Sequence, residues 1–190
     1  MPQLLFGLAL FLGVHSISIF AEGFRDRMAA KSEIGWKAIY SILSLAGLVL
    51  VARGYAEARL DPTVLYIPPM WLRHVAALLL LPVFILFYAP YFPGRIKTAT
   101  KHPQLVAAKL WALSHLLVNG TLADVLLFGS FLAWAVVDRI SLKRRTPRAV
   151  IGAPPKPWND AILVVIGLVT YGVFVYWAHA ALFGVAPFAM

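Results

Sequence analysis

Long runs of hydrophobic residues, without an amphipathic period, dominate this chain. Such runs predict helices that cross a membrane, because about 20 apolar residues in a helix cover a hydrocarbon layer of ~30 Å. The fourth and fifth runs form one apolar block that only Asn119 and Gly120 interrupt, so a tight turn should join these two helices. The sequence therefore predicts an all-α fold, a single multi-pass membrane domain over residues 1–190. The six expected spans are residues 3–21, 36–53, 71–90, 103–119, 121–138 and 160–183.

The composition agrees with a membrane protein. Of the 190 residues, 61% are hydrophobic and 13% are charged, which is outside the usual range of soluble globular proteins. The chain has no cysteine, so disulfides, thiolate ligands and Fe–S clusters are excluded. No basic segment precedes the first apolar run, so we expect a retained span rather than a cleaved signal peptide.

The positive charges indicate how the chain is oriented. The net charge is +9, but the basic residues cluster in loops beside apolar runs, where anionic lipid head groups account for them and nucleic acid is not needed. The first, third and fifth connections hold thirteen lysines and arginines, whereas the other two hold only Arg53, Arg59 and Arg73. The positive-inside rule then places both termini outside the cytoplasm, which in a bacterium means an inner-membrane protein with periplasmic termini.

Two histidines lie deep inside predicted spans, where an ionisable side chain by default indicates a functional site. His15 is about 12 residues into the first span and His115 about 12 residues into the fourth, so both should lie near the bilayer midplane. Two imidazoles at matched depth can supply the two axial nitrogens of a haem iron. Trp111 and Asn119 share a helix stripe with His115 and are candidate cofactor contacts. Helix packing and proton relay remain alternative roles for these histidines.

Three other polar residues in the same region each have two interpretations. His102, at the predicted cytoplasmic interface, could cap a helix or contact a head group, or it could be a ligand. Lys109 could extend to the interface, or it could bind an acidic group such as a haem propionate. Asp124 could cap the fifth span, or it could donate a proton. The chain has no HExxH, GxSxG, P-loop or GxGxxG pattern, so hydrolase, kinase and nucleotide-binding functions have no support.

The segments GVHS, KHPQL, LWALSH and NGTLAD, at the spacing found here, resemble the NnrU family. This resemblance implies a bacterial inner-membrane bundle without a soluble domain, linked to denitrification through nitrite and nitric oxide reduction. The family is in turn similar to the plastid 15-cis-zeta-carotene isomerase, an integral membrane enzyme that binds haem b. By motif, the imidazole haem ligands of that enzyme correspond to His15 and His115, and His102 matches another of its characteristic histidines. The resemblance thus implies a haem b cofactor.

One departure from the isomerase bears on the activity. The isomerase has a cysteine where this chain has Ala112, so a thiolate cannot replace an imidazole on the iron here. A haem held by two histidines has no open position and suits electron transfer better than catalysis. We therefore expect a haem b protein with a redox or isomerase-like role on a membrane-soluble substrate or partner. The alternatives are a non-enzymatic accessory factor for a respiratory reductase, and a small transporter or proton path that uses Lys109, His115, Asn119 and Asp124.

Overall fold

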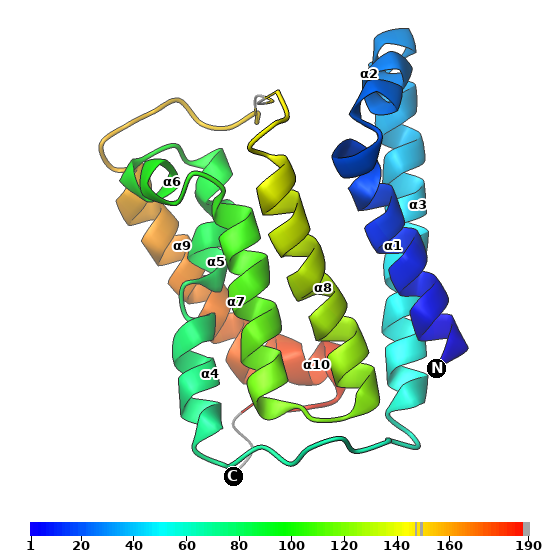
Figure 1. Ribbon diagram of the computed structural model, residues 1–190. Coiled ribbons are helices and arrows are strands. Elements are labelled where there is room, and N and C mark those ends of the chain that lie inside the picture. The colour runs from blue at the N-terminus through cyan, green and yellow to red at the C-terminus, as the bar shows by residue number, and fades with distance from the viewer. Residues whose placement is uncertain (147, 149, 188–190) are drawn as a thin grey trace. The chain divides into compact units, whose positions relative to one another are not determined.

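The computed structural model describes residues 1–146, 148 and 150–187. Within these residues the regular secondary structure is helical, apart from an isolated antiparallel bridge between Val64 and Thr121 (Figure 1). Contacts between Cα atoms divide the chain into two compact units that alternate along the sequence. Unit 1 contains residues 1–68 and 119–146, and unit 2 contains the remaining described residues.

Unit 1 consists of two long apolar helices, a short polar helix between them, and a third long helix from later in the chain. The short helix α2 was not expected, because its sequence EGFRDRMAAK has no hydrophobic run. It separates from its neighbours where Ala21 leaves helical geometry and where the Ser32 hydroxyl caps the next helix by accepting from Gly35 N at 3.0 Å. The helices of unit 1 are α1 (Pro2–Phe20), α2 (Glu22–Lys31), α3 (Glu33–Ala58) and α8 (Leu122–Ser141).

Helices α1 and α3 lie side by side over most of their length (Figure 1). Three glycines allow their backbones to approach this closely. A Cβ atom on Gly7 would lie 2.5 Å from the backbone nitrogen of Val51, and one on Gly47 would lie 2.8 Å from the backbone nitrogen of Phe11. Gly54 meets the backbone of α1 in the same way. Small residues are the usual means of close helix packing in membranes.

The turn before α8 is bound to the loop after α3. The backbone nitrogens of Leu65 and Tyr66 both donate to Gly120 O, at 2.8 and 3.1 Å, and Leu122 N donates to Thr63 O at 2.8 Å. A Cβ atom on Gly120 would overlap the carbonyl oxygen of Tyr66, so the turn requires glycine there. The tight Asn119–Gly120 turn is therefore confirmed, since α7 ends at Val118 and α8 begins at Leu122.

Unit 2 is a second helical group in which α5 contacts both α7 and α9, and α4 contacts α7. Pro82 interrupts the third predicted span, but Leu81 and Pro82 both keep right-handed helical dihedral angles, so the helical course continues, as expected for a kink. The short α6 lies in a loop that the hydropathy pattern left without structure. The elements are α4 (Leu72–Leu80), α5 (Val83–Tyr88), η1 (Ala89–Tyr91), α6 (Arg95–Thr100), α7 (Pro103–Val118), α9 (Asn159–Val173), η2 (Phe174–Ala178) and α10 (His179–Phe183).

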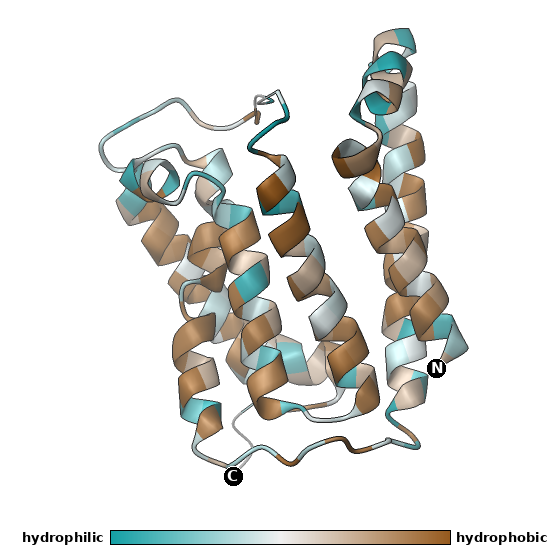
Figure 2. Ribbon diagram, viewed as in Figure 1, coloured by the Kyte–Doolittle hydropathy of each residue, from teal (hydrophilic) through white to brown (hydrophobic). Residues whose placement is uncertain are grey.

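Four helical stretches within the described residues are long and apolar enough to cross a membrane, which indicates a membrane protein. They correspond to the first, second, third and sixth predicted spans, and Figure 2 shows hydrophobic residues along most of each long helix. Helix α7 has only 16 residues, and α8 contains three charged residues, Asp124, Asp138 and Arg139. Length excludes α7, and charge excludes α8, from the stretches that qualify as spans by length and composition alone. Six crossings and periplasmic termini stay predictions. The four stretches are Pro2–Phe20, Glu33–Ala58, Leu72–Tyr91 and Asn159–Phe183.

The glycine contact between α1 and α3 gives a first prediction. Gly47→Ala should destabilise the protein by about 1–3 kcal/mol, because its Cβ meets backbone atoms that cannot move independently. Gly13→Ala on α1 is the matched control, since nothing lies within 4 Å of a Cβ there and alanine favours a helix. The measurement is the fraction of detergent-purified protein that stays monodisperse after heating. Equal thermal stability of the two variants would show that the close approach does not stabilise unit 1.

Candidate functional site

His15 lies in an aromatic cluster inside unit 1. The Phe11 ring stacks on the imidazole with the ring centroids 4.2 Å apart. Tyr40 from α3 approaches to 5.1 Å, and Trp134 from α8 meets the imidazole edge-on at 6.0 Å. The imidazole is thus surrounded by side chains from all three long helices of unit 1 and is held among apolar surfaces.

A hydrogen bond within its own helix fixes the tautomer of His15. Its Nδ1 lies 2.7 Å from the carbonyl oxygen of Phe11, one turn earlier. A carbonyl oxygen can only accept, so Nδ1 carries the proton and, in the neutral ring, Nε2 carries the lone pair. Metal-bound histidines are usually oriented in this way, with the second ring nitrogen bonded to a carbonyl or carboxylate. His15 is therefore in the tautomer that metal-binding histidines usually adopt, with Nδ1 protonated.

His115 repeats this arrangement in unit 2. On α7, its Nδ1 lies 2.8 Å from the carbonyl oxygen of Trp111, again one turn earlier, and the two rings are 5.3 Å apart. The neighbouring Ser114 is fully buried and donates to Leu110 O at 2.7 Å, so it does not orient the imidazole. The same carbonyl-anchored tautomer therefore occurs at both deep histidines, each beside an aromatic residue of its own helix.

Polar groups near His15 are sparse and charged. Asp138, one turn beyond Trp134 on α8, accepts a hydrogen bond from Arg145 in a largely buried ion pair, and its negative charge acts on both His15 and Tyr40. Among the described residues, three buried donors have no hydrogen-bond partner, and all three belong to unit 1. Such groups are rare in folded proteins, and a ligand is one of the things that can satisfy them. They are Ser44 Oγ, Trp134 Nε1 and Arg145 Nε.

Asp124 forms the helix cap that was one of its two expected roles. Its carboxylate accepts from Thr121 N at 2.8 Å, and the Thr121 hydroxyl in turn accepts from Asp124 N at 3.3 Å, which completes a capping box at the start of α8. The same side chain is 4% exposed and accepts a 2.5 Å hydrogen bond from the Tyr55 hydroxyl on α3. Asp124 therefore connects two helices of unit 1.

Asn119 precedes this cap in the chain and is bonded to the loop after α3. Its carbonyl oxygen accepts from the Tyr66 hydroxyl at 2.7 Å, which adds to the backbone bonds between the loop and the turn. Burial, followed by the negative charge of Asp124, raises the pKa of the Tyr66 phenol above its usual value. The phenol therefore remains a hydrogen-bond donor at neutral and moderately alkaline pH.

The other sequence candidates belong to unit 2. Lys109 is half-buried on α7. His102 directly precedes α7, and its carbonyl oxygen accepts from Leu105 N and Val106 N at 3.1 and 3.3 Å. It follows Lys101, whose φ of 59° is unusual for a residue other than glycine. Because His15 belongs to unit 1 and His115 to unit 2, a haem shared by the two remains a prediction.

Sequence reasoning missed the side chains that surround the predicted site. Tyr40 and Trp134 read as ordinary aromatic residues of a span, and only the fold brings them to His15. Asp138 stood at the edge of a predicted span, where a carboxylate is unremarkable. An acidic residue beside an apolar run was nevertheless a usable signal, because such residues seldom lack a partner or a role.

The family model for the NnrU protein matches residues 3–187, nearly the whole chain. The chain belongs to the NnrU family. No curated protein and no solved structure gives a significant match. Among the described residues of this NnrU protein, no group of three or more histidine, aspartate or glutamate side chains could hold a metal ion.

The bond between α3 and α8 gives a second prediction. Tyr55→Phe should destabilise the protein by about 2 kcal/mol, because it leaves a buried carboxylate oxygen of Asp124 without its donor. Tyr176→Phe is the matched control, since that side chain is 87% exposed. Loss of monodisperse protein on heating in detergent measures the effect. If Tyr55→Phe tolerates heat as well as Tyr176→Phe does, the hydrogen bond contributes little to stability.

Proposed function

We propose that this NnrU protein binds haem b, with His15 and His115 as the axial ligands, and that it carries electrons to or from a membrane partner or a lipophilic substrate. The observation that carries the proposal is the matching anchor of the two imidazoles. Each Nδ1 lies within 2.8 Å of the carbonyl four residues earlier, which leaves Nε2 as the lone-pair nitrogen. These are the two deepest histidines of the predicted spans.

The residues present suit such a group. A haem iron takes four nitrogens from its porphyrin and needs only two from the protein, so a pair of histidines is sufficient where no larger ligand cluster exists. Phe11 and Trp134 supply flat apolar surfaces beside His15, and Trp111 supplies one beside His115. Trp134 Nε1 is a buried donor without a partner among the described residues, so it could donate to an acceptor group of a bound ligand. When bound, haem b would supply reversible one-electron chemistry.

Electron transfer is the activity that these residues favour over isomerisation. Ala112, where the resembling isomerase has cysteine, is fully buried and offers no lone pair to the iron. With no third ligand to exchange, two imidazoles would keep both faces of a haem closed. The family's link to nitrite and nitric oxide reduction suggests that the electron partner is a membrane protein of denitrification. The place of action would then be the bacterial inner membrane.

Six crossings are part of the same proposal. In unit 1, Asp124 near the start of α8 bonds Tyr55 near the end of α3, and Trp134 further along α8 lies beside His15, which also contacts Tyr40. Helix α8 therefore runs antiparallel to α3, and its 20 residues give a length of about 30 Å, enough for the hydrocarbon layer. Its charged residues all lie within one or two turns of its ends.

The haem proposal gives a third prediction. Protein purified from haem-replete cells should show a sharp Soret band and, when reduced, the α and β bands of a low-spin b-type haem. His15→Ala and His115→Ala should each abolish these low-spin bands, because each removes an axial nitrogen. His74→Ala, at an exposed position of α4, is the matched control and should keep the full spectrum.

Two outcomes would contradict this assignment. A colourless protein without extractable haem, even after haem supplementation, would exclude a haem function and favour a non-enzymatic accessory factor. Retention of the low-spin spectrum in a monodisperse His15→Ala or His115→Ala variant would show that the substituted histidine is not a ligand. Gel filtration of each variant separates ligand loss from misfolding.

The topology gives a fourth prediction, which the absence of cysteine makes simple to test. Single cysteines at Thr98 and Thr146 should be protected from a membrane-impermeant thiol reagent in whole cells, whereas one at Thr63 should react. Because Thr63 bonds Leu122 beside the turn between α7 and α8, this pattern requires both α7 and α8 to cross. Labelling of Thr98 to the same extent as Thr63 would contradict six crossings.

A further inference from the structure

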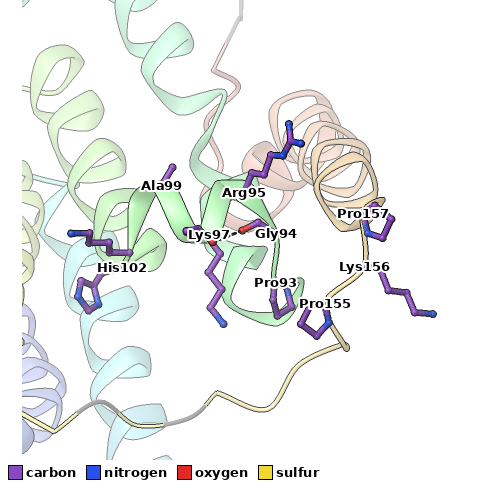
Figure 3. A pocket seen from close by; sticks show the side chains of 11 residues that line it. Pro93, Gly94, Arg95, Lys97, Ala99, His102, Pro155, Lys156 and Pro157 are labelled. Atoms are coloured by element: carbon purple, nitrogen blue, oxygen red, sulfur yellow. Dashed lines mark hydrogen bonds between the residues drawn. The ribbon is translucent and has the colours of Figure 1, made fainter.

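An open groove with a volume of about 1080 Å³ lies in unit 2, and neither deep histidine is among the residues that line it (Figure 3). One wall is the segment 93–102, which includes α6 and the turn into α7, and the other is the segment 155–157. Pro93, Pro155 and Pro157 contribute to the walls, and proline fixes the local backbone. The groove is therefore formed by two segments far apart in the sequence.

The side chains around this groove carry one sign of charge. Four of its lining residues are lysine or arginine, a fifth is His102, and none is acidic. The carboxylate of Asp160 lies against Gly94, and its oxygens accept from the backbone nitrogens of Arg95 and Ile96 at 2.8 and 3.2 Å. That carboxylate is thus directed to the backbone of α6. The four cationic residues are Arg95, Lys97, Lys101 and Lys156.

Hydrogen bonds hold the two walls together before any ligand arrives. The Asn159 side chain is 2% exposed, and its amide nitrogen donates to Pro93 O at 2.9 Å and to Pro154 O at 3.1 Å. Ala153 N donates to Tyr91 O at 2.8 Å. These bonds fasten the segment before α9 to the segment after η1, so the backbone positions that carry the cations are fixed, and the Lys97 ammonium donates to Pro90 O at 3.3 Å.

The groove lies at the ends of two candidate membrane spans. It begins just after Tyr91, which ends the stretch Leu72–Tyr91, and it closes just before Asn159, which begins the stretch Asn159–Phe183. Beside it, Trp158 is 53% exposed, with the Lys156 ammonium 5.2 Å from its ring centroid. Exposed tryptophan and lysine at the end of a span are typical of the head-group layer.

We propose that this groove binds the phosphate head group of an anionic phospholipid of the surrounding leaflet. Its cations match the phosphate charge, and its position at the ends of two spans puts them at the depth of lipid phosphates, with hydrocarbon beside them for the acyl chains. A soluble phosphate compound shares the charge but gains nothing from this depth. The bound lipid would bridge the turn before α7 and the segment before α9.

The test uses the full chain in neutral detergent, titrated with phosphatidylglycerol, with bound lipids counted by native mass spectrometry. Replacing Lys101 and Lys156 together by glutamine should weaken binding roughly tenfold or more, because each cation near a head group contributes about fivefold. The pair Lys31→Gln and Lys143→Gln removes the same charge at exposed positions outside the groove and should weaken binding far less than the groove pair does. Phosphatidylcholine should bind the unchanged protein much more weakly.

Charge-preserving variants separate binding from folding. Lys101→Arg with Lys156→Arg should keep the affinity for phosphatidylglycerol, and all variants should remain monodisperse. Equal loss in the groove and control variants would overturn the proposal, because binding would then depend on net charge alone. Displacement of the lipid by a modest excess of inorganic phosphate would also overturn it, since the groove would then be a site for soluble anions.

Discussion

The fold depends on one constraint, which is that a polar group in a hydrocarbon environment must find its partner within the chain. Helices meet this requirement for the backbone, and the side chains of this protein follow the same rule. The deep imidazoles bond carbonyls of their own helices, and the buried Asp124 is satisfied by a cap and by Tyr55. The three buried donors that break the rule among the described residues all lie in unit 1, and one of them is beside His15.

Helix positions could be read from the sequence because hydrophobic length is a local property. All six predicted runs are helical, and α1 and α9 begin within one residue of the expected positions. Helices α2 and α6 were missed because their polar sequences contain no run of apolar neighbours. The backbone nitrogens of Arg95 and Ile96 in α6 donate to Asp160, a partner that lies far away in the sequence. The pattern also could not show that residues 119–146 pack with the first 68 residues, since hydropathy contains no information on partners.

The candidate site was predictable only as far as its chemistry is local. The two deep histidines could be identified from the sequence, because an ionisable side chain within an apolar run costs free energy and is therefore seldom present without a role. Their tautomer, set by Phe11 and Trp111, follows from side-chain geometry that spacing alone does not fix. Tyr40 and Trp134 come to His15 through tertiary packing, and nothing in their own sequence context distinguishes them. Asp138 differed only in being a carboxylate at the end of an apolar run. Asp124 could be foreseen as a cap from its place after Thr121, but its bond to Tyr55 spans 69 residues.

The alternation of the two units along the chain has a consequence for how the protein is made. Unit 1 is complete only when α8 has been synthesised, after the five helical elements that follow α3, and unit 2 only when α9 has been synthesised. Neither half of the gene encodes a self-contained half of the protein. During synthesis, α1 and α3 therefore pack together before α8 is present to cover them. Their close contact at glycines suits this early pairing. Truncation after α7 would leave both units incomplete. We expect the cell's membrane proteases to degrade such a fragment.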